Sequence, residues 1–277
     1  MAMDKLDNKK IAIIGGGHIG QAFVEGFINS GKITGSQLIV TNPSLSKLIH
    51  LKKLGVEVTS NNKVAARKAD MIFLAVTPPV IGQVLEELKE LLEGKHVISL
   101  AAVISIKSLQ KHVSATEIIR IMPNMAVFCN QGVIGIFSKK KDISEIKQLL
   151  STLGSVIEVE KEEDLDSLTL LSGCGPAIIS QLIEMLAAYG IKIGLSSDIS
   201  HVLAEQTFRG TTAILKKSKQ SPSQLIDAVS TKGGISEAIV QLMQKDDLDI
   251  SFSKAMDAGY KKLIKLKKSL SHYDLNK

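Results

Sequence analysis

The feature that most limits the fold of this chain is a glycine-rich turn close to its start. Four apolar residues at 11–14 lead into Gly-Gly-Gly-His-Ile-Gly at 15–20, and residues 21–28 have the pattern of a helix. A strand, a tight turn and a helix start form the context in which G-x-G-x-x-G is typical of dinucleotide binding. The alternative is a glycine-rich loop without a ligand, and the strand and helix patterns that follow favour the dinucleotide site.

Each position of this turn has an expected physical role. We expect Gly15 to allow the sharp turn, Gly17 to let a pyrophosphate approach the backbone, and Gly20 to let the helix pack closely on the strand. Backbone N–H groups at the positive end of the helix, at His18 and Ile19, then face the phosphates. The His18 side chain has two possible roles at this stage: it contacts the phosphates, or it is simply exposed to solvent.

Short apolar runs, rich in β-branched residues, alternate with helix patterns down to about residue 160. We predict strands at residues 11–14, 38–41, 57–59, 71–76, 97–100, 117–121, 133–137 and 156–159. Nearly continuous apolar runs are typical of parallel strands that are buried on both faces. Residues 1–160 are therefore predicted to form an α/β Rossmann domain with a doubly wound, mostly parallel sheet.

Beyond residue 160 the strand-like runs stop and helical periodicities take over. Helices are predicted at residues 165–171, 177–189, 199–215, 222–229, 237–244 and 252–268. Residues 161–277 are therefore predicted to form an all-α domain, with the acidic segment 160–164 as the hinge. These helices carry too much apolar surface for a small domain that faces water on all sides, so we expect self-association as a homodimer or higher oligomer.

The residues after the second predicted strand indicate which dinucleotide binds. NAD sites usually place Asp or Glu about 20 residues past the glycine motif, where it accepts a hydrogen bond from the ribose 2′-hydroxyl. Here Asn42 and Ser44 follow the strand, with Lys47 one turn later. Hydrogen-bond donors and a positive charge suit a 2′-phosphate, so we expect NADPH, with NADH as the alternative. Ser44 is also a good helix N-cap, and both roles can hold.

Two other strand ends carry residues that a cofactor would meet. Ala75, Val76 and Pro78 follow the fourth predicted strand, at the edge where open α/β sheets bind ligands. The alternative is that these residues only end the strand and contact no ligand. At the end of the sixth strand, Pro123 sets the turn and Asn124 offers a carboxamide to a nicotinamide or to the backbone.

Composition narrows the function classes. The chain carries only Cys129 and Cys174, and its first ten residues show no apolar signal core, so we expect a cytoplasmic protein. The lack of an uninterrupted run of roughly 18 apolar residues argues against a membrane span. Net charge is +6, but the helical spacing of the lysines at 261–268 and the absence of Trp favour a solvated helix face over nucleic-acid binding. The six His show no metal-like spacing.

Two later segments combine glycine with hydroxyl residues ahead of a helix pattern. They are Ser-Gly-Cys-Gly-Pro-Ala at 172–177 and Ser-Thr-Lys-Gly-Gly-Ile-Ser-Glu at 230–237. Three further motifs precede them in the chain: Ala-Val-Thr-Pro at 75–78, Ile-Ser-Leu-Ala-Ala at 98–102 and Arg-Ile-Met-Pro-Asn at 120–124. Together these segments resemble the pyrroline-5-carboxylate reductase family, and the resemblance runs from Gly15 to about Lys268.

The resemblance implies a reductase that uses NAD(P)H to convert 1-pyrroline-5-carboxylate, a cyclic imine carboxylate, into L-proline. It implies a helical domain that interlocks with a partner subunit and an active site between the cofactor and that domain. Ser236 matches the family's threonine whose hydroxyl lies near the ring nitrogen of the substrate. Thr231, Gly233 and Gly234 match the loop that holds the substrate carboxylate through backbone N–H groups. Ala101 matches a stretch that the family places at the cofactor.

The substrate loop departs from the family pattern. The family usually has Ser-Pro before the two glycines and a threonine near the catalytic position, whereas this chain has Thr231 and Lys232 before them and Ile235 and Ser236 after. Three hypotheses stay open: reduction of 1-pyrroline-5-carboxylate, reduction of another cyclic imine acid, and a cofactor-binding or regulatory protein without turnover. A β-hydroxyacid dehydrogenase is disfavoured, because the lysine that such enzymes place one helical turn beyond a G-x-x-G segment is missing after Gly175.

Overall fold

The computed structural model describes residues 9–113, 116–140 and 142–272. The chain folds as two compact units, the first made of Met1–Pro176 with Lys261–Lys277 and the second of Ala177–Tyr260. The predicted domain boundary after residue 160 stays a prediction.

Eight strands of the described part form one sheet, in the order β3-β2-β1-β4-β5-β6-β7-β8. They are β1 Ile11–Ile14, β2 Leu38–Thr41, β3 Glu57–Thr59, β4 Met71–Leu74, β5 His96–Ser99, β6 Ile118–Pro123, β7 Gly132–Phe137 and β8 Gly154–Glu158. Neighbouring strands are parallel except for the antiparallel pair β6 and β7. The doubly wound, mostly parallel sheet is confirmed: β1, β2 and β3 have the predicted bounds, and the ends of the other strands differ from those predicted by at most two residues.

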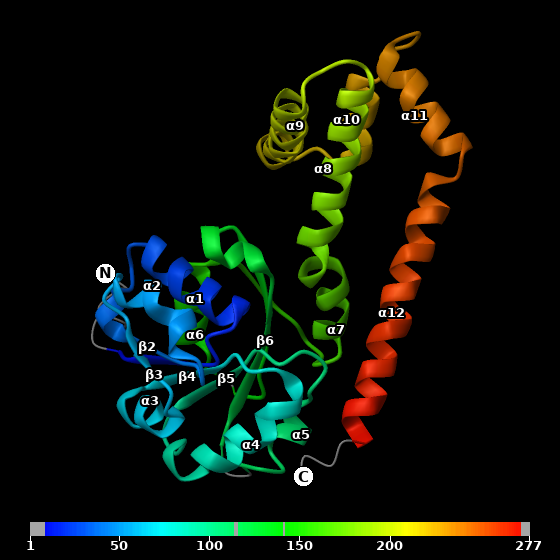
Figure 1. The fold of residues 1–277 in the computed structure, drawn as a ribbon. Coiled ribbons are helices and arrows are strands. Elements are labelled where there is room, and N and C mark those ends of the chain that lie inside the picture. Colours follow the sequence, from blue (N-terminus) through cyan, green and yellow to red (C-terminus); the bar gives the residue numbers. More distant parts are fainter. Residues whose placement is uncertain (1–8, 114–115, 141, 273–277) are drawn as a thin grey trace. The chain divides into compact units, whose positions relative to one another are not determined.

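Helices of the first unit cover both faces of this sheet. Those between the strands are α1 His18–Asn29, α2 Ile49–Lys52, α3 Asn62–Lys68, α4 Pro78–Leu88, α5 Ile106–Leu109 and α6 Ser144–Ser151. α1, α2 and α6 pack on one face and α3, α4 and α5 on the other (Figure 1). Ile11 and Ile13 belong to one core and Ala12 and Ile14 to the other, because successive side chains of a strand point to opposite faces. This explains the uninterrupted apolar run in β1.

The topology of the sheet determines where a ligand can bind. The chain leaves β1 on one side for β2 and β3 and returns on the other side for β4. Open α/β sheets bind ligands outside the carboxyl ends of the strands at such a switch point. β4 ends at Leu74, two residues before the predicted end, because the chain turns there into α4, which begins at Pro78. Proline suits the first position of a helix.

The rest of the described chain is helical. It contains α7 Asp164–Leu168, a π-helical turn Thr169–Gly173, α8 Gly175–Lys192, α9 Ser197–Ser218, α10 Pro222–Val229, α11 Ile235–Lys245 and α12 Leu248–His272. The predicted helices are confirmed, and between the π-helical turn and α8 only Cys174 lies outside a regular helix. The Cys174 N–H donates to Thr169 O at 2.9 Å, a bond across five residues that keeps the chain helical. Pro176 falls in the first turn of α8, where its missing N–H is not needed.

One helical stretch, Asp164–Lys192, is long and apolar enough to cross a membrane by length and composition. Its most apolar window has a mean hydropathy of 1.4, and 6% of that window is buried. Polar residues interrupt this stretch, so it contains no long uninterrupted apolar run. One such helix is weak evidence of a membrane span, but its apolar surface requires a cover, either lipid or protein.

Candidate active site

A cavity of about 410 Å³ opens at the carboxyl edge of the sheet. Its walls include Gly15, Gly17, Asn42, Ala75 and Val76, all predicted from the sequence as cofactor residues. They come from the glycine turn and from the loops after β2 and β4, and β2, β1 and β4 are adjacent in the sheet. The structure therefore brings these five residues together around one space.

The three glycines of the G-x-G-x-x-G pattern have different surroundings. Gly15 has a φ of +108°, and a Cβ there would lie 2.7 Å from Ala75 O. A Cβ on Gly20 would lie 2.1 Å from Gly15 O, so α1 can approach the turn this closely only with glycine. At Gly17 a Cβ would meet nothing within 4 Å. The chain itself needs Gly15 and Gly20, while the open space at Gly17 leaves room for a pyrophosphate.

The N-terminus of α1 lies at this cavity. Gly17 is the N-cap residue of α1, and no side chain caps the helix. N–H groups of the first turn, which contains His18 and Ile19, therefore have no helix partner and are available to an anion. The His18 side chain is exposed, while Ile19 packs half-buried against the core. The backbone at these positions is thus the part best placed for phosphate.

The loop after β2 is held in place by Asn42. Its Nδ2 donates to Gly16 O at 3.0 Å and its Oδ1 accepts from the Ser44 N–H at 2.9 Å, which leaves one amide N–H for a ligand. Ser44 is the N-cap residue of a 3₁₀ helix, Leu45–Leu48, but its side chain makes no capping bond and its hydroxyl lies 2.9 Å from a neighbouring serine. Lys47 is exposed in the same short helix. Of these three residues Asn42 lines the cavity, and Ser44 and Lys47 follow it in the same short stretch of chain.

Sequence reasoning missed several polar residues in the cavity wall. Ser60, Asn62, Thr77, Gln83 and Glu87 also line it. Asn62 Nδ2 donates to Glu87 Oε2 at 3.0 Å and so joins α3 to α4 across the wall. Only their positions in the sequence could have indicated these residues, since Ser60 and Asn62 follow the third predicted strand and Thr77 follows the fourth.

The remaining predicted cofactor residues lie at the same edge of the sheet, outside the lining of the cavity. Pro78 is the first residue of α4, and Pro123 is the last residue of β6. Ala101 follows β5 and is buried, with its N–H 3.3 Å from Ser99 Oγ. Pro78 therefore lies where the chain leaves β4, while Ala101 and Pro123 lie at or just after the ends of β5 and β6.

Asn124 makes two side-chain hydrogen bonds. Its Oδ1 accepts from the Val133 N–H at 3.2 Å, and its Nδ2 donates to Ser172 Oγ at 3.2 Å. The carboxamide thus joins the antiparallel strand β7 to the π-helical turn. Of the two partners predicted for this group, a nicotinamide or the backbone, the backbone bond is present.

Arg120 and the acidic segment form a buried ion pair in the first unit. Arg120 Nη1 donates to Glu162 Oε1 at 2.8 Å, and the same oxygen accepts from the Ile106 N–H at 2.6 Å. The Arg120 side chain is 6% exposed and that of Glu162 is 17% exposed. The segment predicted as a hinge is therefore attached to β6 and to the start of α5 at this residue.

The predicted substrate residues lie in the second unit, between α10 and α11. Gly234 is the N-cap residue of α11, and its N–H donates to Thr231 O at 2.8 Å. Gly233 has a φ of +75°, which glycine adopts without strain. Ser236 is exposed as the second residue of α11. These four residues therefore lie together at one helix N-terminus.

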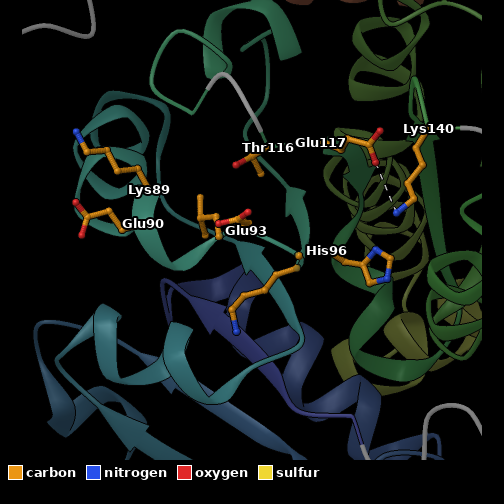
Figure 2. Close-up of a pocket in the computed structure, with 10 residues that line it drawn as sticks. Lys89, Glu90, Glu93, His96, Thr116, Glu117 and Lys140 are labelled. Carbon is orange, nitrogen blue, oxygen red and sulfur yellow. Dashed lines mark ion pairs between the residues drawn. The ribbon is translucent and has the colours of Figure 1, made fainter.

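A larger cavity, of about 570 Å³, lies at the opposite edge of the sheet (Figure 2). Lys89, Glu93, His96, Glu117 and Lys140 are among its lining residues, and Lys140 Nζ pairs with Glu117 Oε2 at 3.6 Å. His96 begins β5 and Glu117 precedes β6, so this is the edge at which the parallel strands begin. Although this cavity is the larger of the two, we place the dinucleotide in the smaller one, because ligands of such sheets bind at the carboxyl edge.

Neither place carries a metal centre in the described ranges. No group of three or more His, Cys, Asp or Glu residues is placed there to hold a metal ion. Cys174, beside the π-helical turn, is a free and exposed thiol.

A glycine turn that opens an uncapped helix at the switch point of a doubly wound sheet defines a dinucleotide-binding protein of the Rossmann class. Residues 10–103 match a family model for NADP oxidoreductase, coenzyme F420-dependent, and residues 162–266 match one for pyrroline-5-carboxylate reductase dimerisation. Over 258 residues the chain is 33% identical to pyrroline-5-carboxylate reductase of Corynebacterium melassecola, an alignment that covers 90% of this chain and 95% of that one. The chain belongs to the pyrroline-5-carboxylate reductase family.

Solved structures of relatives have the same fold. The crystal structure of Plasmodium falciparum pyrroline carboxylate reductase with NADP bound is similar with a TM-score of 0.84 at 30% identity, covering 95% of this chain and 98% of that one. A pyrroline-5-carboxylate reductase from Coxiella burnetii gives a TM-score of 0.83 at 32% identity, covering 95% and 99%. The likeness therefore extends over both units of the chain.

Proposed function

We propose that this protein reduces 1-pyrroline-5-carboxylate to L-proline with NADPH as the hydride donor. The observation that carries the proposal is the extent of the family match. The chain covers 95% of the Corynebacterium reductase and 98% of the NADP-bound Plasmodium structure, so it includes both the glycine turn and the α10–α11 loop. NADH is the alternative donor.

The residues of the first unit fit a phosphorylated dinucleotide. The open space at Gly17 and the free N–H groups of His18 and Ile19 suit the pyrophosphate. We assign the 2′-phosphate to the free amide N–H of Asn42 and the ammonium group of Lys47. When bound, NADPH supplies the hydride for the C=N carbon of the substrate.

Residues of the second unit carry the groups that we assign to the substrate. We assign its carboxylate to the backbone N–H of Gly233, while Gly234, whose N–H donates to Thr231 O at 2.8 Å, and Thr231 shape the loop around it. The Ser236 hydroxyl would hydrogen-bond the ring nitrogen and orient it to take up a proton from solvent water when the neighbouring carbon receives the hydride. Holding the ring in a reactive orientation contributes more here than a strong base would.

We propose that the second unit is covered by a second copy of the chain, in a homodimer or higher oligomer. Among the described residues of this unit, Ala187 and Ala204 are its buried apolar residues, while large side chains such as Ile193 and Val202 are more than 60% exposed. The same contact would cover Asp164–Lys192 with protein in place of lipid. We infer that the protein is a cytoplasmic enzyme and that it binds neither a membrane nor nucleic acid.

A second candidate substrate is another cyclic imine acid. The observation that favours it is Ile235, which is 83% exposed next to Ser236 at the start of α11. An apolar side chain of this size at the substrate loop can select for ring size, because each methylene in a pocket changes binding by about 1–3 kcal/mol.

One assay separates these proposals. The purified protein is incubated with NADPH or NADH and with 1-pyrroline-5-carboxylate, its six-membered homologue or a ring isomer that carries a 2-carboxylate. We expect the largest kcat/KM with NADPH and 1-pyrroline-5-carboxylate. A larger value for another ring would transfer the function to that imine acid, and NADPH binding without any reduction would leave a cofactor-binding or regulatory protein.

A further inference from the structure

One contact in the substrate loop concerns a residue to which the mechanism gives no role. Glu237, the third residue of α11, directs its side chain back to the loop, and its Oε2 accepts a hydrogen bond from the Gly233 N–H at 2.6 Å. The proposed function, on which this inference rests, assigns that N–H to the substrate carboxylate. A carboxylate of the chain itself therefore occupies the position.

The rest of the loop is arranged to receive an anion. The Gly234 N–H is used by Thr231 O at 2.8 Å, so the Gly233 N–H is the one that points to a carboxylate. A Cβ on Gly233 would meet nothing within 4 Å, which leaves space beside this N–H. Ser230 Oγ, in the same loop, is buried and has no hydrogen-bond partner among the described residues. The loop therefore binds one carboxylate, that of Glu237, and has a free hydroxyl, that of Ser230, which a second carboxylate could use. Such a loop can exchange the Glu237 carboxylate for that of a ligand.

We propose that Glu237 is an internal competitor for the carboxylate of the imine acid and so determines the affinity for that substrate. Substrate binding then requires the Glu237 carboxylate to leave the Gly233 N–H. The competition is strong because a hydrogen bond to an ionised acceptor is about twice as strong as a neutral one. Two carboxylates that lie side by side at one helix N-terminus also repel each other.

The substitution Glu237→Gln tests this competition with little change of shape. Glutamine keeps an oxygen that can accept from the Gly233 N–H and cap the helix, but it removes the negative charge. We expect the KM for the imine acid to fall about five-fold, with kcat and the KM for NADPH nearly unchanged. Asp249→Asn is the matched control, because it removes a carboxylate from the first turn of α12 and should leave all three constants as they are.

A binding measurement separates this inference from the proposed reaction. Pyrrole-2-carboxylate, a ring with the carboxylate but no reducible imine, is titrated calorimetrically into the NADPH complex of each full-length protein. We expect its Kd to fall about five-fold in Glu237→Gln and also in Glu237→Ala, with thermal melting to check that both variants fold. If wild type reduces no imine while both variants bind the probe more tightly, the proposed reaction fails and the competition stands.

Two outcomes would overturn the competition. An unchanged Kd and KM in both variants would leave Glu237 as a helix cap and nothing more. A raised KM in both variants would mean that the carboxylate attracts the positively charged form of the substrate nitrogen, the opposite of competition. Either result is compatible with wild-type activity on 1-pyrroline-5-carboxylate.

Discussion

At the scale of single residues, the structure separates backbone roles from side-chain roles in the glycine turn. Gly15 and Gly20 are required by contacts of less than 3 Å that any Cβ would make with the chain, whereas Gly17 has open space. Substitution at the first two should therefore damage the fold of the turn, and substitution at Gly17 should damage ligand access. The side chains that distinguish one dinucleotide from another lie elsewhere, after β2.

Lys47→Ala tests the choice of cofactor. Lys47 is exposed, and an exposed charge pair contributes up to about 1 kcal/mol. We expect the KM for NADPH to rise about five-fold while the KM for NADH stays constant, because only NADPH carries the 2′-phosphate. Lys52→Ala, an exposed lysine at the end of α2, is the control. An unchanged ratio of the two KM values would count against the assignment of Lys47.

Ser236→Ala tests the proposed hydroxyl. A net hydrogen bond of about 1–1.5 kcal/mol corresponds to roughly a ten-fold change in rate. We therefore expect kcat to fall about ten-fold, with the KM for NADPH unchanged. Ser236→Thr keeps the hydroxyl and should retain most of the rate in steady-state assays. Equal activity of the alanine variant would remove Ser236 from the mechanism.

At the scale of elements, polar side chains decide how helices and segments attach. The Arg120–Glu162 pair links the acidic segment to β6 and to the start of α5. In the second unit, His201 links α9 to α8: its Nε2 lies 3.2 Å from Glu184 Oε2, and its Nδ1 lies 2.8 Å from Ser197 O. The first link is buried and the second is exposed, so they should respond differently to substitution and to pH.

Glu162→Gln tests the buried link. Removal of one partner leaves the charge of Arg120 buried and uncompensated, which costs about 3–5 kcal/mol. We expect a loss of about 3 kcal/mol in urea unfolding at fixed protein concentration. Glu57→Gln breaks the exposed pair with Lys68, whose side chains are 45% and 51% exposed, and should cost less than about 1 kcal/mol. Equal costs would show that burial of the first pair contributes nothing.

The link at His201 predicts a pH dependence. The hydrogen bond to the Ser197 carbonyl, and then the one to Glu184, raise the pKa of His201 above its usual range. Its contribution to stability is therefore complete below the unfolded pKa of about 6.5 and is lost as the pH rises through the folded value. In melting curves taken at increasing pH, starting roughly one unit below the unfolded pKa, the extra stability of wild type over His201→Ala should shrink as the pH rises. A constant difference would contradict this.

At the scale of the whole molecule, the two units differ in how much apolar surface they bury. The first has two continuous cores, one on each face of the sheet, while the described part of the second leaves most of its large apolar side chains exposed. Burial of apolar surface is the main favourable term in folding. The second unit therefore requires another surface to be stable in water.

Light scattering after size-exclusion chromatography tests this requirement. We expect a mass of at least twice 29.8 kDa. Leu203→Lys, on the exposed surface of α9, should shift the protein toward monomer or reduce its yield, and Gln206→Lys, three residues away on the same helix, is the control. A stable 29.8 kDa monomer would overturn the oligomer, and recovery only in detergent would favour a lipid cover for Asp164–Lys192.

The sequence by itself determined the strands of the sheet, the glycine turn and the loop before α11. Apolar periodicity and the need for a positive φ or for a missing Cβ act within a few residues, so they can be recognised in the chain. Only the tertiary structure decided the partners of polar side chains: Asn42 bonds Gly16, 26 positions away, Arg120 bonds Glu162, 42 away, and Asn124 bonds Ser172, 48 away. Such bonds depend on which distant chain segments the fold brings together, and this cannot be predicted from the pattern of neighbouring residues in the sequence.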